Sequence, residues 1–294
     1  MPLAPAAFPA PPGASVSVGP LDIRMYGLMI GLGVIAAVWL LGRRLVEIGA
    51  GTTDDAASIA TWGVAGGIVG ARLYHVATDW DRFADDLGAI PAIWKGGLGI
   101  PGGLLVGIVA GLWVARRRGL VTADVLWAVA PALPLGQAIG RWGNWFNQEL
   151  FGLTTDLPWG LSVDDTYLPA GAASGTLFHP TFLYESMWNL GLAGVLIVVG
   201  RHWGRNGGGL LAVYVAGYGL GRFWVEGLRI DRADELAGLR WNQWVAAAAV
   251  VGGVALAVRA HRRASGAGGE DGAPTSDAAL SGHHDDGLGT PPVA

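Results

Sequence analysis

The residues best suited to do chemistry in this chain lie in one short segment, residues 140–152. This segment places an arginine, two asparagines, a glutamine and a glutamate beside three glycines, in the order Gly-Arg-Trp-Gly-Asn-Trp-Phe-Asn-Gln-Glu-Leu-Phe-Gly. On a helix, Arg141 and Asn144 would be i,i+3 neighbours. A guanidinium group stays charged and offers a planar fork of donors, so the pattern suits recognition of an anionic group such as phosphate.

A second arginine lies in a largely apolar stretch later in the chain. Tyr218, Arg222 and Glu226 follow one another at i,i+4 spacing, which places them on one face of a helix. Further polar residues flank other apolar stretches; they are Tyr26, Arg72, His75, Glu149 and Glu185. If these ends of the stretches meet, two arginines face one cavity. They would then bind a phosphate and stabilise charge that develops on it as a leaving group.

The surroundings of these polar residues are apolar enough for a lipid bilayer. Hydrophobic residues make up 52% and charged residues 14% of the 294-residue chain, and the mean hydropathy is +0.42, which is typical of a membrane protein. Nearly uncharged runs predict seven membrane-spanning helices, near residues 26–42, 59–78, 97–115, 124–146, 182–200, 208–226 and 241–258. An ionised side chain at the bilayer centre costs about 2.5–3.5 kcal/mol on insertion scales, so arginines within these runs indicate a polar, partly hydrated cavity.

Basic residues predict the orientation of this bundle. Arginines follow the first, third, fifth and seventh runs, whereas the alternate loops are acidic or mixed; the arginines are Arg43, Arg44, Arg116, Arg117, Arg118, Arg201, Arg205, Arg259, Arg262 and Arg263. Because Lys and Arg concentrate in cytoplasmic loops, we expect the N-terminus outside and the C-terminus in the cytoplasm. The polar residues of the candidate site then share the outer half of the bundle.

The predicted fold is all-α, with the seven spans in one membrane domain over residues 22–263. Residues 1–21 form an extracytoplasmic N-terminal segment in this interpretation. Residues 264–294 are rich in Gly, Ala, Ser, Asp and Pro with few large apolar side chains, so they predict a disordered cytoplasmic tail.

Several functions are disfavoured by what the chain contains. It has no cysteine, so any thiol chemistry must use a thiol of the substrate. The net charge is −4, and the arginine clusters are explained by topology, so we expect no nucleic-acid partner. The tail sequence His283-His284-Asp285-Asp286 has metal-binding residue types but is more typical of a solvated segment. We expect neither a metal ion nor a cofactor.

Residues 140–152 resemble the signature of the prolipoprotein diacylglyceryl transferase family, Gly-Arg-x-Gly-Asn-x-x-Asn-x-Glu-x-x-Gly. Similar stretches occur in the same order at residues 26–27, 70–72, 179–185 and 218–226, and the resemblance extends over roughly residues 22–258. It implies a multi-pass enzyme of the bacterial inner (cytoplasmic) membrane. Such an enzyme transfers the sn-1,2-diacylglyceryl group of phosphatidylglycerol to the thiol of the lipobox cysteine in a prolipoprotein and releases glycerol phosphate.

The same resemblance assigns roles to individual residues. It implies a catalytic set of Arg141, Arg222, Tyr26 and Glu149. It implies a phosphatidylglycerol-binding set of Arg141, Asn144, Gly152, Tyr218, Arg222 and Glu226, in which Gly152 permits a tight loop.

This chain departs from the family pattern in the third span, where many members have His-Gly-Gly. Here the sequence is Pro101-Gly102-Gly103, so the histidine proposed to assist thiol deprotonation is missing. Tyr26, Glu149 and His179 are the candidate replacements. Alternatively, the arginines lower the pKa of the thiol, ordinarily near 8.5, so that no dedicated base is needed.

Other classes of membrane protein fit the sequence less well. A transporter would explain a polar, glycine-rich bundle, but no repeated halves occur and the polar residues are displaced outward from the midplane. An intramembrane protease would need a Gly-x-Ser-x-Gly or His-Glu-x-x-His motif, which is missing. A scaffold has no need for the cluster between Arg141 and Glu149. The role of Arg72 stays open between contact with lipid headgroups from a helix end and membership of the site.

Overall fold

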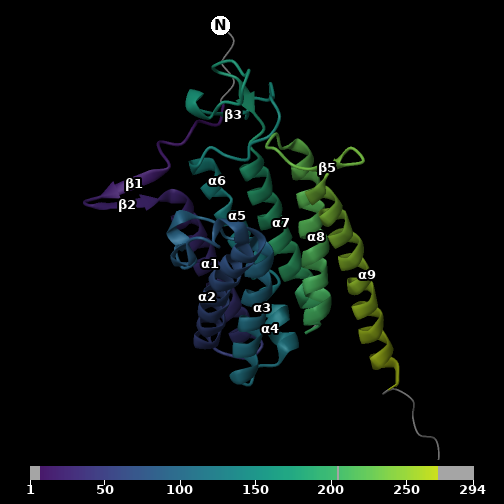
Figure 1. Cartoon of the computed structure of the whole chain (residues 1–294). Helices are drawn as coiled ribbons and strands as arrows, with labels where there is room; N and C mark the ends of the chain where they lie inside the picture. Colours follow the sequence, from purple (N-terminus) through teal and green to yellow (C-terminus); the bar gives the residue numbers. More distant parts are fainter. Residues whose placement is uncertain (1–6, 204, 271–294) are drawn as a thin grey trace, which may run out of the picture.

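The computed structural model describes residues 7–203 and 205–270, and most of these residues are helical. The helices lie side by side with loops and short hairpins at one end (Figure 1). They are α1 (Met25–Glu47), α2 (Thr53–Thr78), α3 (Ile100–Arg117), α4 (Thr122–Val129), α5 (Ala132–Gly140), α6 (Trp142–Phe146), α7 (Thr181–His202), α8 (Gly207–Leu228) and α9 (Trp241–Glu270). Short 3-10 turns are η1 (Trp80–Arg82), η2 (Leu87–Ala89), η3 (Ile93–Lys95) and η4 (Asp165–Tyr167). The predicted all-α membrane class is confirmed as a mostly helical bundle.

Three small antiparallel hairpins are the β-structure of the described residues. They are β1 (Ser15–Val18) with β2 (Leu21–Arg24), β3 (Leu161–Ser162) with β4 (Leu177–Phe178), and β5 (Glu235–Leu236) with β6 (Leu239–Arg240). The first hairpin leads directly into α1, so the predicted boundary between residues 21 and 22 falls inside strand β2. The predicted tail begins within the last turns of α9; its residues 271–294, with the His-His-Asp-Asp sequence, lie outside the described residues.

All seven predicted runs coincide with helical segments, and five of these helices are long and apolar enough to cross a membrane. The five are α1, α2, α3, α7 and α9. The run at 208–226 is helix α8, which carries Arg222 and Glu226. The run at 124–146 is broken into α4, α5 and α6, with Pro131 preceding α5 and Arg141 between α5 and α6. Proline cannot donate a backbone hydrogen bond, which accounts for the first break.

Large apolar side chains point away from the bundle, as they do in a protein surrounded by lipid. Ile35, Leu105 and Val251 are 65%, 67% and 71% exposed on three different helices. A soluble protein rarely exposes such continuous apolar surface. Inside the bundle, Leu45, Leu196 and other buried side chains of α1, α4, α7 and α8 form the main core. The structure is therefore that of a membrane protein.

Helices α2 and α3 approach each other so closely that glycine is required on both. A Cβ atom on Gly70 would lie 2.4 Å from the Gly102 carbonyl oxygen, and one on Gly102 would lie 2.3 Å from the Gly70 carbonyl oxygen. Small residues permit such backbone contacts between membrane helices. The glycines of the Pro101-Gly102-Gly103 sequence thus serve helix packing, while Pro101 is exposed in the first turn of α3.

Arg72 anchors the loop between α2 and α3, so both expectations for this residue are wrong. Its side chain is buried, and its guanidinium lies 5.1 Å from the centre of the Phe83 ring. It donates hydrogen bonds of 2.6–2.9 Å to four backbone carbonyl groups, those of Ala89, Ile90, Gly96 and Gly97. A carbonyl-rich loop folded back over the helix end satisfies the arginine without lipid headgroups or substrate.

Candidate active site

Two arginines from different helical segments bind one carboxylate near the loop-rich end of the bundle. Glu185, in the first two turns of α7, is buried. Arg141 forms an ion pair through Nε with its Oε2, and Arg222 Nη1 donates to its Oε1 at 2.9 Å. The predicted meeting of the two arginines is confirmed, and each takes one oxygen of the same carboxylate. The two guanidinium groups are thus spaced for a small anion with paired oxygens.

The break in the fourth helical segment sets the position of Arg141. This residue lies between α5 and α6, where the regular helix is interrupted although the Arg141 backbone keeps a helical conformation. Gly143, two residues further on, packs against α1, because a Cβ atom there would lie 2.8 Å from the Tyr26 ring. Helix α1 thus supports the segment that carries Arg141.

Tyr218 lies within hydrogen-bonding reach of Arg141, although it is the helical neighbour of Arg222. Its ring stacks on Tyr214 with the centroids 5.9 Å apart, and Gln137 Nε2 donates to the Tyr214 hydroxyl at 2.9 Å. A cavity of about 10 Å³ is lined by Glu185, Trp188, Asn189, Tyr218, Gly221 and Arg222. It has room for about one water molecule.

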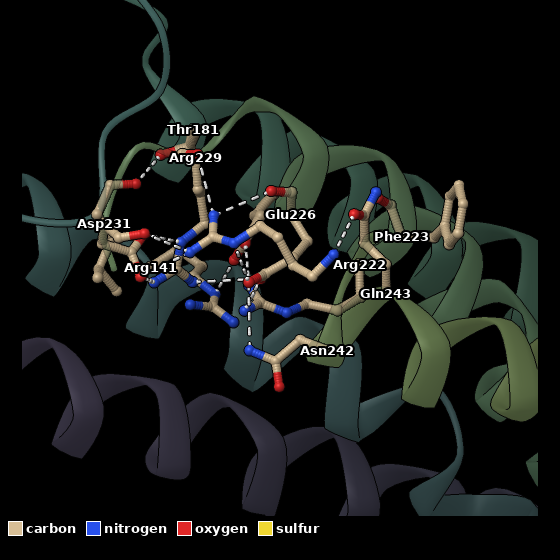
Figure 2. Close-up of polar contacts among 12 residues, drawn as sticks. Arg141, Thr181, Arg222, Phe223, Glu226, Arg229, Asp231, Asn242 and Gln243 are labelled. Carbon is tan, nitrogen blue, oxygen red and sulfur yellow. Dashed lines mark hydrogen bonds and ion pairs between the residues drawn. The ribbon is translucent and has the colours of Figure 1, made fainter. Parts of the chain in front are cut away.

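Glu226 connects Arg222 to a second pair of arginines. Its side chain is fully buried and forms ion pairs with Arg222, with Arg240 Nε at 3.3 Å and with Arg229 Nη1 at 3.7 Å. Asn242 Nδ2 adds a hydrogen bond of 3.2 Å to its Oε1. Figure 2 shows these side chains converging from α8, from the loop after it and from the start of α9. Removal of such a carboxylate would leave several buried cations without a counter-ion.

Asp231 completes the network beside this second pair. Its carboxylate receives two hydrogen bonds from Arg229, of 2.7 and 2.9 Å, and one of 3.1 Å from Arg240. Partial burial alone would raise the pKa of the Asp231 carboxyl, but the hydrogen bonds and charges of the two arginines outweigh it and hold this pKa below its ordinary value. The connected network contains four arginines and three carboxylates, an excess of one positive charge.

Sequence reasoning missed the second arginine pair. Arg229 and Arg240 belong to a loop on the predicted outer side, and the loop was interpreted only as mixed in charge. Arginines on that side run against the positive-inside tendency, which was the available signal. Glu185 was recognised as a polar residue at a helix end, but not as the partner of both site arginines. No spacing rule links residues on three separate helices.

Asn144 and Glu149 bind each other and shape the turn after α6. Asn144 Nδ2 donates to Glu149 Oε1 at 2.9 Å, and Asn147 Nδ2 donates to the same oxygen at 3.3 Å. The link between Asn144 and Arg141 is through the backbone, where the Asn144 N–H donates to the Arg141 carbonyl at 3.1 Å. Glu149 is exposed, whereas Asn144 is buried. The predicted i,i+3 neighbours Arg141 and Asn144 are thus joined through the backbone. The Asn144 side chain binds Glu149 and stabilises the turn that follows.

Gly152 lets three segments approach one another, in agreement with the expected tight loop. A Cβ atom there would lie 2.9 Å from both the His179 Cβ and the Leu228 carbonyl oxygen. The Gly152 N–H donates to the His179 carbonyl at 2.9 Å, and Gly152 forms an isolated bridge with Arg229. The end of the signature segment is thereby joined to the start of the loop after α8, which contains Arg229 and Arg240.

The three candidate bases lie in different surroundings. Tyr26 packs on Gly143 beside Arg141, and Glu149 accepts the two amide hydrogen bonds described above. His179 Nδ1 lies 3.1 Å from the Tyr184 hydroxyl, which also accepts from Trp159 Nε1 at 3.0 Å. Tyr26 is therefore the candidate that packs against the segment carrying Arg141.

The fold and the site together define a helical membrane protein with a buried, anion-binding arginine pair. Comparison with known proteins assigns the family. The model of the prolipoprotein diacylglyceryl transferase family matches residues 14–259. This chain therefore belongs to that family.

Similar relatives cover most of the chain. A protein named phosphatidylglycerol–prolipoprotein diacylglyceryl transferase 2, from Streptomyces coelicolor, is 45% identical over 260 residues, which are 87% of this chain and 81% of the relative. A second Streptomyces coelicolor protein, with the same name and the number 1, is 46% identical over 81% of this chain and 69% of its own length. The Paenarthrobacter aurescens protein of that name is 44% identical over 82% of this chain and 79% of its own length.

Proposed function

We propose that this chain is a phosphatidylglycerol–prolipoprotein diacylglyceryl transferase. It takes the sn-1,2-diacylglyceryl group from phosphatidylglycerol and transfers it to the thiol of the lipobox cysteine of a prolipoprotein. Family membership supports the reaction class, and the relatives' names supply the two substrates. The chain works in the bacterial cytoplasmic membrane, where both a phospholipid donor and a secreted acceptor are available.

The proposal rests on one observation. Arg141 and Arg222 each bind one oxygen of the Glu185 carboxylate. A phosphodiester presents a similar pair of anionic oxygens, so it fits the same two guanidinium groups. Without Glu185, the four arginines and the two remaining carboxylates of the network have an excess of two positive charges, which favours an anion beside Arg141 and Arg222. In the proposed complex, the phosphate takes the place that Glu185 now occupies.

The reaction follows from this placement. The thiolate sulfur of the lipobox cysteine attacks the carbon that joins the diacylglyceryl group to the phosphate, and a carbon–sulfur bond forms. The carbon–oxygen bond to phosphate breaks, and its electron pair leaves with glycerol phosphate. The phosphate group then carries one more negative charge than the diester did. Arg141 and Arg222 stabilise that developing charge, which is where a positioned donor lowers the barrier.

The thiol must lose its proton before or during this attack. In our proposal the positive network lowers the pKa of the thiol, so that no dedicated base is needed; the bound phosphate offsets part of this effect. Tyr26, beside Arg141, is positioned to orient the arginine rather than to remove the proton. Gly152 and Asn144 hold the backbone of the phosphatidylglycerol site, and Glu226 keeps Arg222 charged and oriented.

We further propose that the bundle spans the membrane seven times, with α4–α6 and α8 as the two spans beyond the five long apolar helices. A broken helix is tolerated at membrane depth where it is buried in protein or lines a hydrated cavity. We place the N-terminus outside and the C-terminus in the cytoplasm, because arginines gather at the C-terminal ends of α1, α3, α7 and α9, and these helix ends lie at one end of the bundle (Figure 1). The arginine pair then opens toward the outer leaflet.

The transfer assay tests the function and the role of the arginine fork together. Purified protein incubated with phosphatidylglycerol and a lipobox peptide should increase the peptide's mass by one diacylglyceryl group and release glycerol phosphate, as measured by mass spectrometry. Arg141→Lys and Arg222→Lys should each reduce the transfer rate by roughly 100-fold, because an ammonium group keeps the charge but loses the fork. Arg116→Lys, an exposed arginine at the opposite end, is the control. Full activity of Arg222→Lys at normal expression would show a point-charge role instead.

The topology predicts where a reporter is active. A phosphatase fused after Arg263 should be inactive, because it stays in the cytoplasm, whereas a cytoplasmic reporter such as a fluorescent protein should be functional there. The same two reporters inserted in the loop between α2 and α3, after Asp85, should show the reverse pattern. An active phosphatase after Arg263 in correctly inserted protein would overturn the orientation.

Single substitutions distinguish a dedicated base from electrostatic activation. Tyr26→Phe, Glu149→Gln and His179→Ala should each retain measurable transfer, and the slowest of them should recover as pH rises toward the ordinary thiol pKa of about 8.5. The measurement is the transfer rate between pH 6 and 9 with phosphatidylglycerol binding as the control. If one variant binds both substrates but fails at every pH, that residue is the base and the electrostatic explanation is wrong.

A further inference from the structure

A second positively charged cavity lies at the other end of the bundle from the arginine pair. Its volume is about 550 Å³, and α1, α5 and α7 form its walls. Arg201, on its rim, follows Glu185 by sixteen residues along α7, which is roughly 24 Å of helix. The cavity is therefore separate from the candidate active site, and nothing in the proposed reaction uses it.

The lining of this cavity divides into a charged end and an apolar wall. The charged end consists of Arg43, Arg44 and Arg201 with one carboxylate, Glu47, so it has an excess of two positive charges. The apolar lining consists of Trp39, Leu40, Leu135, Leu190, Ala193, Gly194 and Ile197. Along α7 the charged residue lies at the helix end and the apolar residues lie toward the middle of the bundle. A phospholipid has the same arrangement of a charged group followed by an acyl chain.

The environment of Arg44 is the strongest evidence that this cavity binds a ligand. Its side chain is 3% exposed, and neither Nε nor Nη2 has a hydrogen-bond partner among the described residues. The guanidinium stacks on the Trp127 ring, 3.6 Å from its centre, and a Cβ atom at Gly200 would lie 3.1 Å from Nη2. The Trp127 ring and Gly200 enclose the guanidinium group but accept no hydrogen bond from its Nε or Nη2 atoms. A buried cation with unused donors is costly unless an anion binds it.

Topology alone does not explain this arginine. The positive-inside tendency requires only that basic residues lie in the loop, where Arg43 and Arg201 are exposed to solvent. Arg44 is instead buried between α1, α4 and α7, at the cavity wall. We propose that the cavity binds an anionic phospholipid of the leaflet at this end of the bundle, with its phosphate on Arg44 and Arg201 and an acyl chain along α7. That leaflet is the cytoplasmic one in the proposed topology.

Photocrosslinking tests this site without relying on transfer activity. The probe is phosphatidylserine with a photoreactive acyl chain, added to the purified full chain in nanodiscs, and the crosslinked residues are mapped by peptide mass spectrometry. We expect label on residues 190–197 of α7, and we expect unlabelled phosphatidylserine to displace it. Phosphatidylcholine and inorganic phosphate should not displace it at the same concentration.

Variants of both parts of the cavity make the test specific. Arg44→Gln and Arg201→Gln should each reduce labelling of α7 by roughly ten-fold, because hydrogen bonds to charged groups contribute about that factor. Arg201 is exposed, so its variant remains informative if Arg44→Gln fails to fold. Gly194→Trp should also block labelling, because a Cβ atom at Gly194 meets nothing within 4 Å and the indole would fill the cavity. Arg116→Gln is the matched control.

Three results would overturn the proposal. Equal displacement of the probe by phosphatidylcholine would show that the cavity binds acyl chains without recognising the lipid headgroup. Displacement by inorganic phosphate would show a site for soluble anions. Unchanged labelling in Arg201→Gln and in folded Arg44→Gln would show that these arginines bind no lipid.

Discussion

Two positive charges that face each other inside a membrane bundle need a negative partner, and this requirement organises the site. Arg141 and Arg222 enter the bundle from separate helical segments, and both bind the carboxylate of Glu185 on a third. Without that partner the two cations would repel each other in a medium of low dielectric constant. The Glu185 carboxylate holds the two guanidinium groups close together. The same arrangement would fit another anion with two oxygens.

The rest of the outer end can be understood as support for this arrangement. Arg141 lies between α5 and α6 and pairs with the buried Glu185, and Gly143 lets Tyr26 of α1 pack against the segment. On the other side, Glu226 fixes Arg222 and is itself enclosed by Arg229 and Arg240. Each carboxylate therefore contacts more than one arginine, and the network keeps its positive excess without leaving a buried acid unpaired. This is where we propose that an anionic lipid binds.

The helices could be predicted from the sequence because apolar runs of sufficient length leave a membrane chain few alternatives. The meeting of Arg141 with Arg222 could also be predicted, since the orientation of alternating spans brings the same ends together. Contacts that depend on loop geometry could not. The sequence left the role of Arg72 open between lipid contact and substrate contact, whereas a loop of the protein folds over it and accepts four hydrogen bonds from it. Likewise, the partner of Asn144 is Glu149, and only the conformation of the turn between them brings them together.

The most direct test of the central claim is a structure of the protein in nanodiscs with phosphatidylglycerol and without an acceptor peptide, in which no transfer can occur. Our interpretation predicts that the lipid phosphate lies within hydrogen-bond distance of both the Arg141 and Arg222 guanidinium groups, and that the Glu185 carboxylate has moved from between them. A phosphate bound elsewhere, with both arginines still on Glu185, would contradict it.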